Sequence, residues 1–131
     1  FEDCIIHSKR NSYVTAASTP KEAKYGYVFK HCKLTAEPGV DKVYLGRPWR
    51  PYAYTLFIEC ELGKHIVLAG WHNWGKQSNE ETARYMEYKN TGEGANASER
   101  VAWSKQLTKK EAEAVTVDAI FRTQSDWNPI D

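Results

Sequence analysis

A 28-residue repeat is the feature that most restricts how this chain can fold. Cys4, Cys32 and Cys60 are 28 residues apart, and each follows a phenylalanine by three positions. One more step of 28 residues reaches Tyr85 and Tyr88, where tyrosine replaces both residue types. Self-similarity at a fixed period of roughly 20 to 50 residues is typical of proteins built from stacked units.

The repeated unit has the composition of a β-strand. Residues 27–29 and 54–58 are rich in aromatic and β-branched types, and second strands are expected at 13–16, 43–45 and 65–68. The strands recur without hairpin turns or crossover helices between them. We therefore predict an all-β fold, a parallel β-helix (a solenoid) with 28-residue rungs.

A β-sandwich is the competing all-β fold. It would place strands roughly every 8 to 12 residues and join them by turns such as Asn-Gly or Asp-Gly. Neither dipeptide occurs in the sequence, so the β-helix is favoured. Equivalent residues of a β-helix stack on one another. Two ladders are expected to face the interior: Phe1, Phe29, Phe57 and Tyr85, and Cys4, Cys32 and Cys60.

The cysteines allow three interpretations. We favour a ladder of small buried hydrophobic side chains, because free cysteine is among the most buried residue types. A disulfide between neighbouring rungs fits the distance between their Cα atoms, but one cysteine would be left over. A metal site is disfavoured, because strand alternation points His31 and its neighbour Cys32 to opposite faces. We expect neither a metal nor a cofactor.

The C-terminal part has a different character. A capping box formed by Thr108 and Glu111 begins a single predicted amphipathic helix over residues 109–121. A last extended piece is expected before it, at 101–103. Because solenoids need a cover over their last rung, we expect the helix and the tail to form that cap. The apolar stripe of the helix would comprise Ala112, Val115 and Ala119.

Composition excludes two kinds of partner. Charges of both signs are interspersed and the formal net charge is +1, so we expect no nucleic-acid surface. No apolar run approaches the length of a membrane span, so we expect no membrane insertion. The first rung starts at Phe1 without a cap, and unpaired strand edges favour pairing with other chains. We therefore expect further sequence upstream and self-association through the N-terminal rung.

The loop at residues 46–49 is the strongest candidate site. Gly46 allows backbone geometry that other residues resist, and Pro48 fixes its own φ angle and biases Arg47 towards an extended conformation. The backbone therefore holds a cation, Arg47, and an aromatic plate, Trp49, in fixed positions. An ordinary surface turn is the alternative, since most turns carry no function.

A second loop, at residues 69–82, is long for a compact solenoid. It contains Trp71 and Trp74 between glycines. We expect Trp71 to pack beneath the loop as an anchor. We expect Trp74 to line a groove beside the 46–49 loop. The remaining histidines His7, His65 and His72 show no catalytic spacing and are interpreted as solvated or packed.

The stretch Tyr-Leu-Gly-Arg-Pro-Trp at residues 44–49 resembles a signature of the pectinesterase (pectin methylesterase) family. Four further stretches resemble motifs of that family in the same order and spacing: residues 13–16, 65–71, 82–95 and 100–103. The resemblance implies a right-handed parallel β-helix. It also implies a secreted, periplasmic or cell-surface location.

The resemblance further implies hydrolysis of methyl esters in polygalacturonate, with release of methanol from pectin. In the family an Asp carboxylate attacks the ester carbonyl, a second Asp acts as acid and then base, and a Gln steadies the oxyanion. Carried over to this chain, Arg47 supports catalysis by keeping the nucleophilic Asp ionised, and Trp49 lines the sugar groove. Trp74 is assigned to the groove on a looser match.

The chain departs from the family at the catalytic motifs. The nucleophile lies in D-F-x-F-G, and the acid/base and oxyanion residues lie in Q-D-T and Q-A segments; none of these occurs here. We therefore expect residues 1–131 to be the C-terminal part of one pectinesterase-like domain, with rungs at 1–104, helix and tail at 105–131, and no activity alone. Two alternatives stay open: a non-catalytic module that binds acidic polysaccharide, and a structural β-helix such as an adhesin arm.

Overall fold

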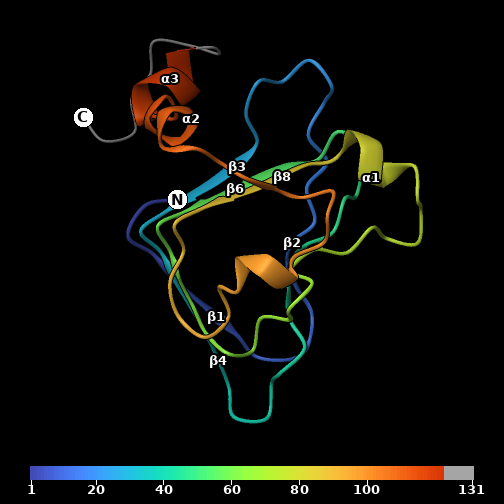
Figure 1. Cartoon of the computed structure of the whole chain (residues 1–131), viewed down its shortest axis with the longest axis vertical. Helices are drawn as coiled ribbons and strands as arrows, with labels where there is room; N and C mark the ends of the chain where they lie inside the picture. Colours follow the sequence, from blue (N-terminus) through green and yellow to red (C-terminus); the bar gives the residue numbers. More distant parts are fainter. Residues whose placement is uncertain (123–131) are drawn as a thin grey trace.

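Every strand pairing recorded for this protein is parallel, so each turn of the chain returns to the same side of a three-sided coil (Figure 1). The computed structural model describes residues 1–122. Three sheets form the sides, named here by their first strands. The β1 sheet contains β1 (Ile5–Ser8), β4 (Lys33–Ala36) and β7 (Glu61–Leu62); the β2 sheet contains β2 (Tyr13–Thr15) and β5 (Tyr44–Gly46); the β3 sheet contains β3 (Tyr27–Lys30), β6 (Tyr54–Ile58), β8 (Arg84–Tyr88) and β9 (Lys105–Gln106).

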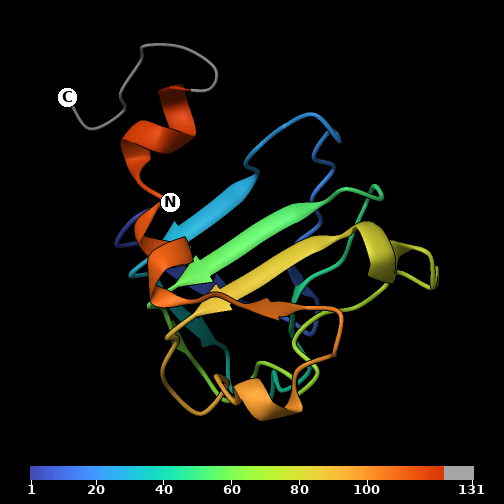
Figure 2. The ribbon, with the colours of Figure 1, turned by 45° about the horizontal axis from the view of Figure 1, so that its top comes forward.

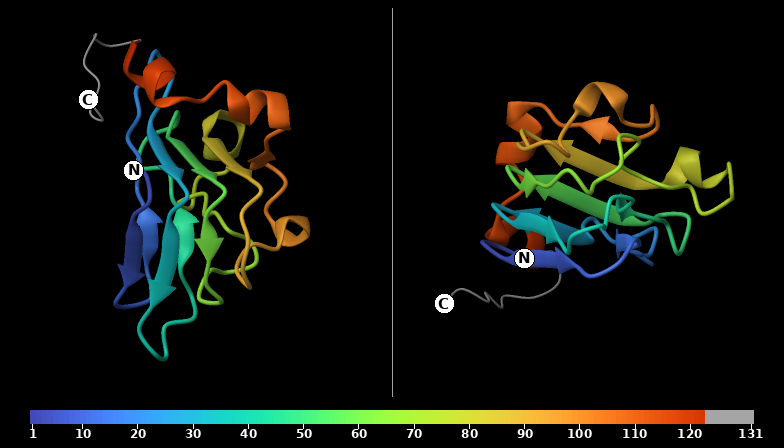
Figure 3. Two further views of the ribbon diagram at one scale, coloured as in Figure 1. Left: turned by 90° about the vertical axis from the view of Figure 1, so that its left-hand side faces the viewer. Right: turned by 90° about the horizontal axis from the view of Figure 1, so that it is seen from below.

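The chain visits the three sheets in the same order on every turn. Figure 3 shows the rungs stacked in sequence order, from blue at one end to orange at the other. Such a stack makes each rung the template for the next, because the backbone groups of one strand bond to the equivalent strand above and below. The predicted parallel β-helix is confirmed.

The predicted 28-residue register holds for the first three rungs only. Phe29 pairs with Phe57, a step of 57 − 29 = 28 residues. Phe57 pairs with Glu87, a step of 87 − 57 = 30 residues. The prediction that Tyr85 continues the phenylalanine ladder is therefore wrong by two residues. Because side chains on a strand alternate with a period of two, Tyr85 still faces the interior.

An indole ring from the long loop explains the lengthened register. The rings of Phe1, Phe29 and Phe57 stack at centroid distances of 4.8 and 4.5 Å. Next comes Trp71, tilted at 6.0 Å from Phe57 and stacked at 4.3 Å on Tyr85. Trp71 thus occupies the interior space between the third and fourth rungs. Each such aromatic pair stabilises the fold by roughly 0.5–1.5 kcal/mol beyond the burial of its area.

The cysteines form the predicted interior ladder. All three are free, and Cys32 and Cys60 are buried. The Cys60 thiol donates to the carbonyls of Ile58 and Phe29 at 3.4 and 3.5 Å. Burial raises the pKa of Cys60 to about 12, so it packs as a neutral thiol. The interpretation of the ladder as small buried hydrophobic side chains is confirmed.

Each rung turns its corner between the β3 and β1 sheets through one residue in the left-handed region. Those residues have φ angles of 45–55° and are Asp3, His31, Glu59 and Lys89. One left-handed residue reverses the side-chain alternation locally and bends the strand sharply. The side chain of His31 points outward, where its ring nitrogens lie 4.0 and 3.8 Å from the carboxylates of Asp3 and Glu59.

Two predicted strands are absent from the described residues. The stretch 65–68 is a turn that touches its neighbour through one bridge, Val43 to Ile66. Its turn is closed by the Ile66 amide, which donates to the Gly63 carbonyl at 3.2 Å. The stretch 101–103 also contains a turn, and the last strand, β9, follows it. Short helices occupy two loops, α1 at Asn79–Thr82 and the 3₁₀ helix η1 at Ala97–Glu99.

The predicted single C-terminal helix is two helices, α2 (Lys109–Glu113) and α3 (Val117–Arg122). The predicted capping box of α2 is present, with both hydrogen bonds between Thr108 and Glu111. The break follows because Thr116 accepts from the Ala119 amide at 3.0 Å, which is the bond of a second helix cap. The Lys30 ammonium satisfies a carbonyl in the break, that of Val115, at 3.3 Å.

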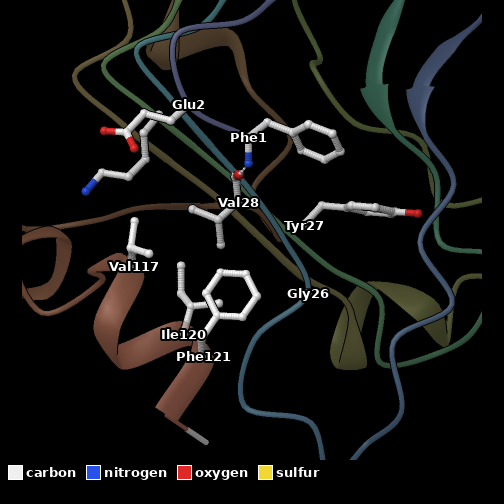
Figure 4. Close-up of a pocket in the computed structure, with 9 residues that line it drawn as sticks. Phe1, Glu2, Gly26, Tyr27, Val28, Val117, Ile120 and Phe121 are labelled. Carbon is white, nitrogen blue, oxygen red and sulfur yellow. Dashed lines mark hydrogen bonds between the residues drawn. The ribbon is translucent and has the colours of Figure 1, made fainter. Parts of the chain in front are cut away.

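The two helices do not cover the last rung, so the predicted cap is wrong in its placement. They run back along the outer face of the β3 sheet towards the first rung (Figure 2). The apolar side chains there bury against Val115 and Ile120. Between α3 and the first rung lies an apolar cavity of about 460 Å³ (Figure 4), lined in part by Phe1, Val28 and Phe121. The predicted tail, 123–131, lies outside the described residues.

A buried ion pair takes the place of an aromatic ring in the fourth rung. The Arg100 Nε lies 2.8 Å from Glu87 Oε2, and both side chains are at most 3% exposed. Arg100 also donates to the carbonyls of Gly94 at 2.6 Å and Leu68 at 3.1 Å. Glu87 accepts from the Trp71 indole at 3.4 Å. The pair therefore ties two loops to strand β8.

Replacing Arg100 by methionine should lower the free energy of unfolding by about 3–5 kcal/mol, because Glu87 would stay buried without its counter-charge. The matched control is Lys33→Met, which breaks an exposed pair with Glu61 at 3.3 Å. That change should cost at most about 1 kcal/mol. Urea unfolding at neutral pH measures both values. Equal losses in the two variants would contradict the assigned role of the buried pair.

Candidate functional site

The loop that carries the predicted site is held tightly against the solenoid. Gly46 ends strand β5, and a Cβ atom there would collide with the Thr15 hydroxyl and lie 3.1 Å from the Trp71 indole. The amides of Arg47 and Trp49 donate to backbone carbonyls of the preceding rung at 3.1 and 3.0 Å. Pro48 is fully buried. The loop is therefore a rigid support, as its glycine and proline predict.

The Arg47 guanidinium lies between two aromatic rings. Its central carbon is 3.8 Å from the centroid of Trp74 and 4.5 Å from that of Tyr13. Cation–π contacts of this kind stabilise an arginine by roughly 0.5–2 kcal/mol each and fix the plane of its fork. The Arg47 Nε is buried without a hydrogen-bond partner. None of the ion pairs recorded within residues 1–122 includes Arg47.

Two exposed indoles lie beside this cation. Trp49 is 58% exposed and Trp74 is 40% exposed, and their ring centroids are 6.5 Å apart. The structure thus brings together the three residues that the sequence singled out from two separate loops. Large exposed aromatic side chains that are held rigidly are a feature of binding surfaces. Trp71 is 1% exposed and anchors its loop, as expected.

Sequence reasoning missed two members of the cluster, Tyr13 and His72. Tyr13 and Tyr44 are register partners on neighbouring strands, and their rings stack at 5.4 Å. The His72 ring packs edge-on against both, at 5.7 and 5.2 Å. The repeat could have revealed the tyrosine pair, because both residues lie in predicted strands of adjacent rungs. We name the set Tyr13, Tyr44, Arg47, Trp49, His72 and Trp74 the aromatic platform.

Trp74 adopts an unusual backbone conformation. Its φ angle is 60°, a region that bulky residues rarely enter. Side chains of its two predecessors support it: the Trp74 amide donates to His72 Nδ1 at 2.9 Å, and the Gly75 amide donates to Asn73 Oδ1 at 2.9 Å. The Asn73 amide in turn donates to Glu80 in α1 at 2.8 Å. Strained residues held in this way cluster at functional sites.

The other histidines lie away from the platform. His65 is buried, with Nε2 unpartnered, and burial lowers its pKa, so it is a packed neutral ring. His7 is exposed and bonds Thr35 at 2.7 Å. Within residues 1–122 no cluster of three or more His, Cys, Asp or Glu side chains could hold a metal ion. None of the helices in that part of the chain is long and apolar enough to cross a membrane.

The platform therefore offers one fixed cation with a free donor, and flat apolar plates around it. A guanidinium of this kind pairs with a carboxylate through charge-assisted hydrogen bonds. Indole faces suit flat ligand rings that combine apolar faces with polar edges. The described residues contain no nucleophile and base in contact at this place. The platform is thus half of a site that recognises acidic, ring-shaped groups.

Comparison with known proteins places these features in a family. The model of the family described as Pectinesterase matches residues 1–124. Pectinesterase 31 of Arabidopsis thaliana is 39% identical over 112 residues, covering 85% of this chain and 35% of that protein. Putative pectinesterase 11 of Arabidopsis thaliana is 38% identical over 130 residues, covering 97% of this chain and 36% of that protein.

Solved structures agree with the fold. The pectin methylesterase from carrot superposes with a TM-score of 0.80 at 30% identity, covering 92% of this chain and 43% of that one. A pectin methylesterase in complex with a hexasaccharide also gives a TM-score of 0.80, at 27% identity, covering 98% of this chain and 45% of that one. The chain spans about a third of the length of the curated relatives described above. Its rungs, its signature loop and these matches together show that the chain belongs to the pectinesterase family.

Proposed function

We propose that this chain is the C-terminal part of a pectin methylesterase domain and supplies one wall of the groove that binds homogalacturonan. The whole protein would remove methyl groups from pectin and release methanol, outside the cell or at its surface. One observation carries the proposal: Arg47 is fixed between two aromatic rings with a buried, unpaired Nε, beside two exposed indoles.

Arg47 would act by pairing with a carboxylate from outside the described residues. A guanidinium in contact with an aspartate favours its ionised form and lowers its pKa, which keeps a nucleophilic carboxylate charged. The stacking on Tyr13 and Trp74 prevents the fork from rotating away. This arrangement suits a supporting role in ester attack, in which the arginine orients the nucleophile and makes no bond to the substrate.

Trp49 and Trp74 would bind the sugar rings. Their indoles are exposed on the same surface, so consecutive rings of a polysaccharide could lie across them. A related pectin methylesterase has been crystallised with a hexasaccharide. Stacking requires rigid plates, since an ordered side chain loses less conformational entropy on binding. Both tryptophans meet this requirement through the loop bonds described above.

A non-catalytic role in binding acidic polysaccharide is the second candidate, and one observation favours it. The chain lacks the D-F-x-F-G and Q-D-T motifs that carry the reacting groups in the family. The platform alone would still bind acid sugars. The upstream sequence of the parent protein separates the two candidates, because only an esterase needs those motifs there. A purely structural β-helix would not need a cation held between exposed indoles.

Binding to polygalacturonate should depend on Arg47. Loss of a charge-assisted hydrogen bond costs roughly 1.5–3 kcal/mol, so Arg47→Ala should weaken binding about tenfold or more. Arg50→Ala is the matched control, because Arg50 is an exposed arginine three residues away on the same loop. Isothermal titration calorimetry with oligogalacturonate would measure both. Equal affinity of the two variants would sink the placement of Arg47 in the groove.

The chain 1–131 should release no methanol from methylated pectin, because its aspartates do not include the motif residues that attack the ester. A methanol assay on the purified chain tests this. The control is the same preparation with an intact pectin methylesterase added, which excludes inhibition by the sample. Methanol release above the uncatalysed rate from the chain alone would overturn the assignment of the nucleophile to upstream sequence.

The first rung should mediate self-association of the isolated chain. Strand β1 is an edge of its sheet, and three large apolar side chains near it are exposed: Phe1 at 63%, Ile5 at 73% and Tyr27 at 45%. Unpaired, apolar edges pair with one another. Light scattering should show dimers or larger species, and Ile5→Lys should shift them towards monomer. A monodisperse monomer of the unmodified chain would refute this contact.

A further inference from the structure

We infer that His72 is a positioning residue that holds Trp74 against Arg47 through an acceptor that only the neutral imidazole offers, and that protonation of His72 releases this plate. The inference rests on the proposed role of Trp74 in the saccharide groove. It adds a residue and a pH response that the sequence motifs do not suggest.

The hydrogen bond determines the protonation state of the ring. The donor is the Trp74 backbone amide, which can only donate, and its acceptor is His72 Nδ1 at 2.9 Å. Nδ1 must therefore carry a lone pair, and the proton of the neutral ring must lie on Nε2. An imidazolium has protons on both nitrogens, so it cannot accept this bond. Protonation would also bring two N–H groups into opposition.

The bond matters because Trp74 sits in a strained conformation. With a φ angle of 60°, an indole-bearing residue is held at a cost of roughly 1–3 kcal/mol. A net hydrogen bond contributes roughly 0.5–1.5 kcal/mol, comparable to that cost. Loss of the His72 acceptor would therefore shift the segment out of its left-handed turn. Trp74 would then leave the Arg47 guanidinium, which now lies 3.8 Å from its centroid.

The surroundings hold the ring in place and leave its charge uncompensated. Tyr13 from β2 and Tyr44 from β5 pack edge-on against it. The charged groups closest to this part of the platform are Arg47, which stacks on Tyr13 and Trp74, and Glu80, which bonds the neighbouring Asn73. Glu80 is thus already engaged with Asn73, and no ion pair recorded within residues 1–122 includes His72. A proton on His72 would add positive charge beside an arginine, which strengthens the release.

Three variants separate the acceptor from the ring. His72→Asn places a side-chain oxygen near the position of Nδ1 and does not titrate. His72→Phe keeps the aromatic packing on the tyrosines and removes the acceptor. Trp74→Ala removes the plate itself and gives the reference for its loss. The three other histidines titrate equally in all variants, so differences between variants report on His72 alone.

The first measurement follows the Trp74 amide by nitrogen–proton NMR of the full chain without saccharide, between about pH 5 and about pH 7.5, where imidazole titrates. In the unmodified chain the amide proton should shift upfield as the pH falls, because it loses its acceptor. In His72→Asn it should stay downfield throughout. A Trp74 amide that does not respond to pH in the unmodified chain would overturn the inference.

The second measurement compares affinities for oligogalacturonate at the two ends of that pH range. The unmodified chain should bind about threefold or more weakly at about pH 5, approaching Trp74→Ala, while His72→Asn should keep its affinity. His72→Phe should match Trp74→Ala at both pH values. Unchanged affinity of His72→Phe would refute the positioning role. If Trp74→Ala itself keeps full affinity, the groove assignment of Trp74 fails, and the amide shift still decides the role of His72.

Discussion

The buried ion pair between Glu87 and Arg100 is the contact on which the fourth rung and the platform loop both depend. Glu87 stands where the register of the earlier rungs places a phenylalanine, and a lone carboxylate there would cost several kcal/mol. Arg100 meets it at 2.8 Å and bonds carbonyls of two loops as well. A Cβ larger than that of glycine at Gly70 would collide with Arg100, so the backbone there is adapted to the pair.

The effect of this pair reaches the aromatic platform through Trp71. The Trp71 indole donates to Glu87, stacks on Tyr85, and lies so close to Gly46 that a side chain there would not fit. The loop that carries Arg47 begins at Gly46. A core contact thus supports the position of a surface cation. Packed interiors transmit such constraints because they leave little free volume for adjustment.

Sequence periodicity predicted the solenoid because, in a stack, the sequence period equals the length of one turn. The prediction held for the Phe1–Phe57 ladder and the cysteines, where each rung repeats the one before. It failed at Tyr85, because the Trp71 ring came from a loop and required two extra residues in that turn. The helix break at Thr116 was missed for a related reason: Lys30, 85 residues away from Val115, satisfies a carbonyl in the break.

The same distinction applies to the platform. Arg47 and Trp49 could be identified because glycine and proline restrict the backbone locally, and Trp74 because its loop is long. Tyr13 and His72 could not, since their contribution exists only where three segments meet. Trp74 joins both cases, because its strained φ angle depends on a neighbour in sequence, His72, whose ring is held by strands β2 and β5. A rigid saccharide surface can therefore be built on an irregular loop, provided that the regular rungs beneath it determine where each supporting side chain lies.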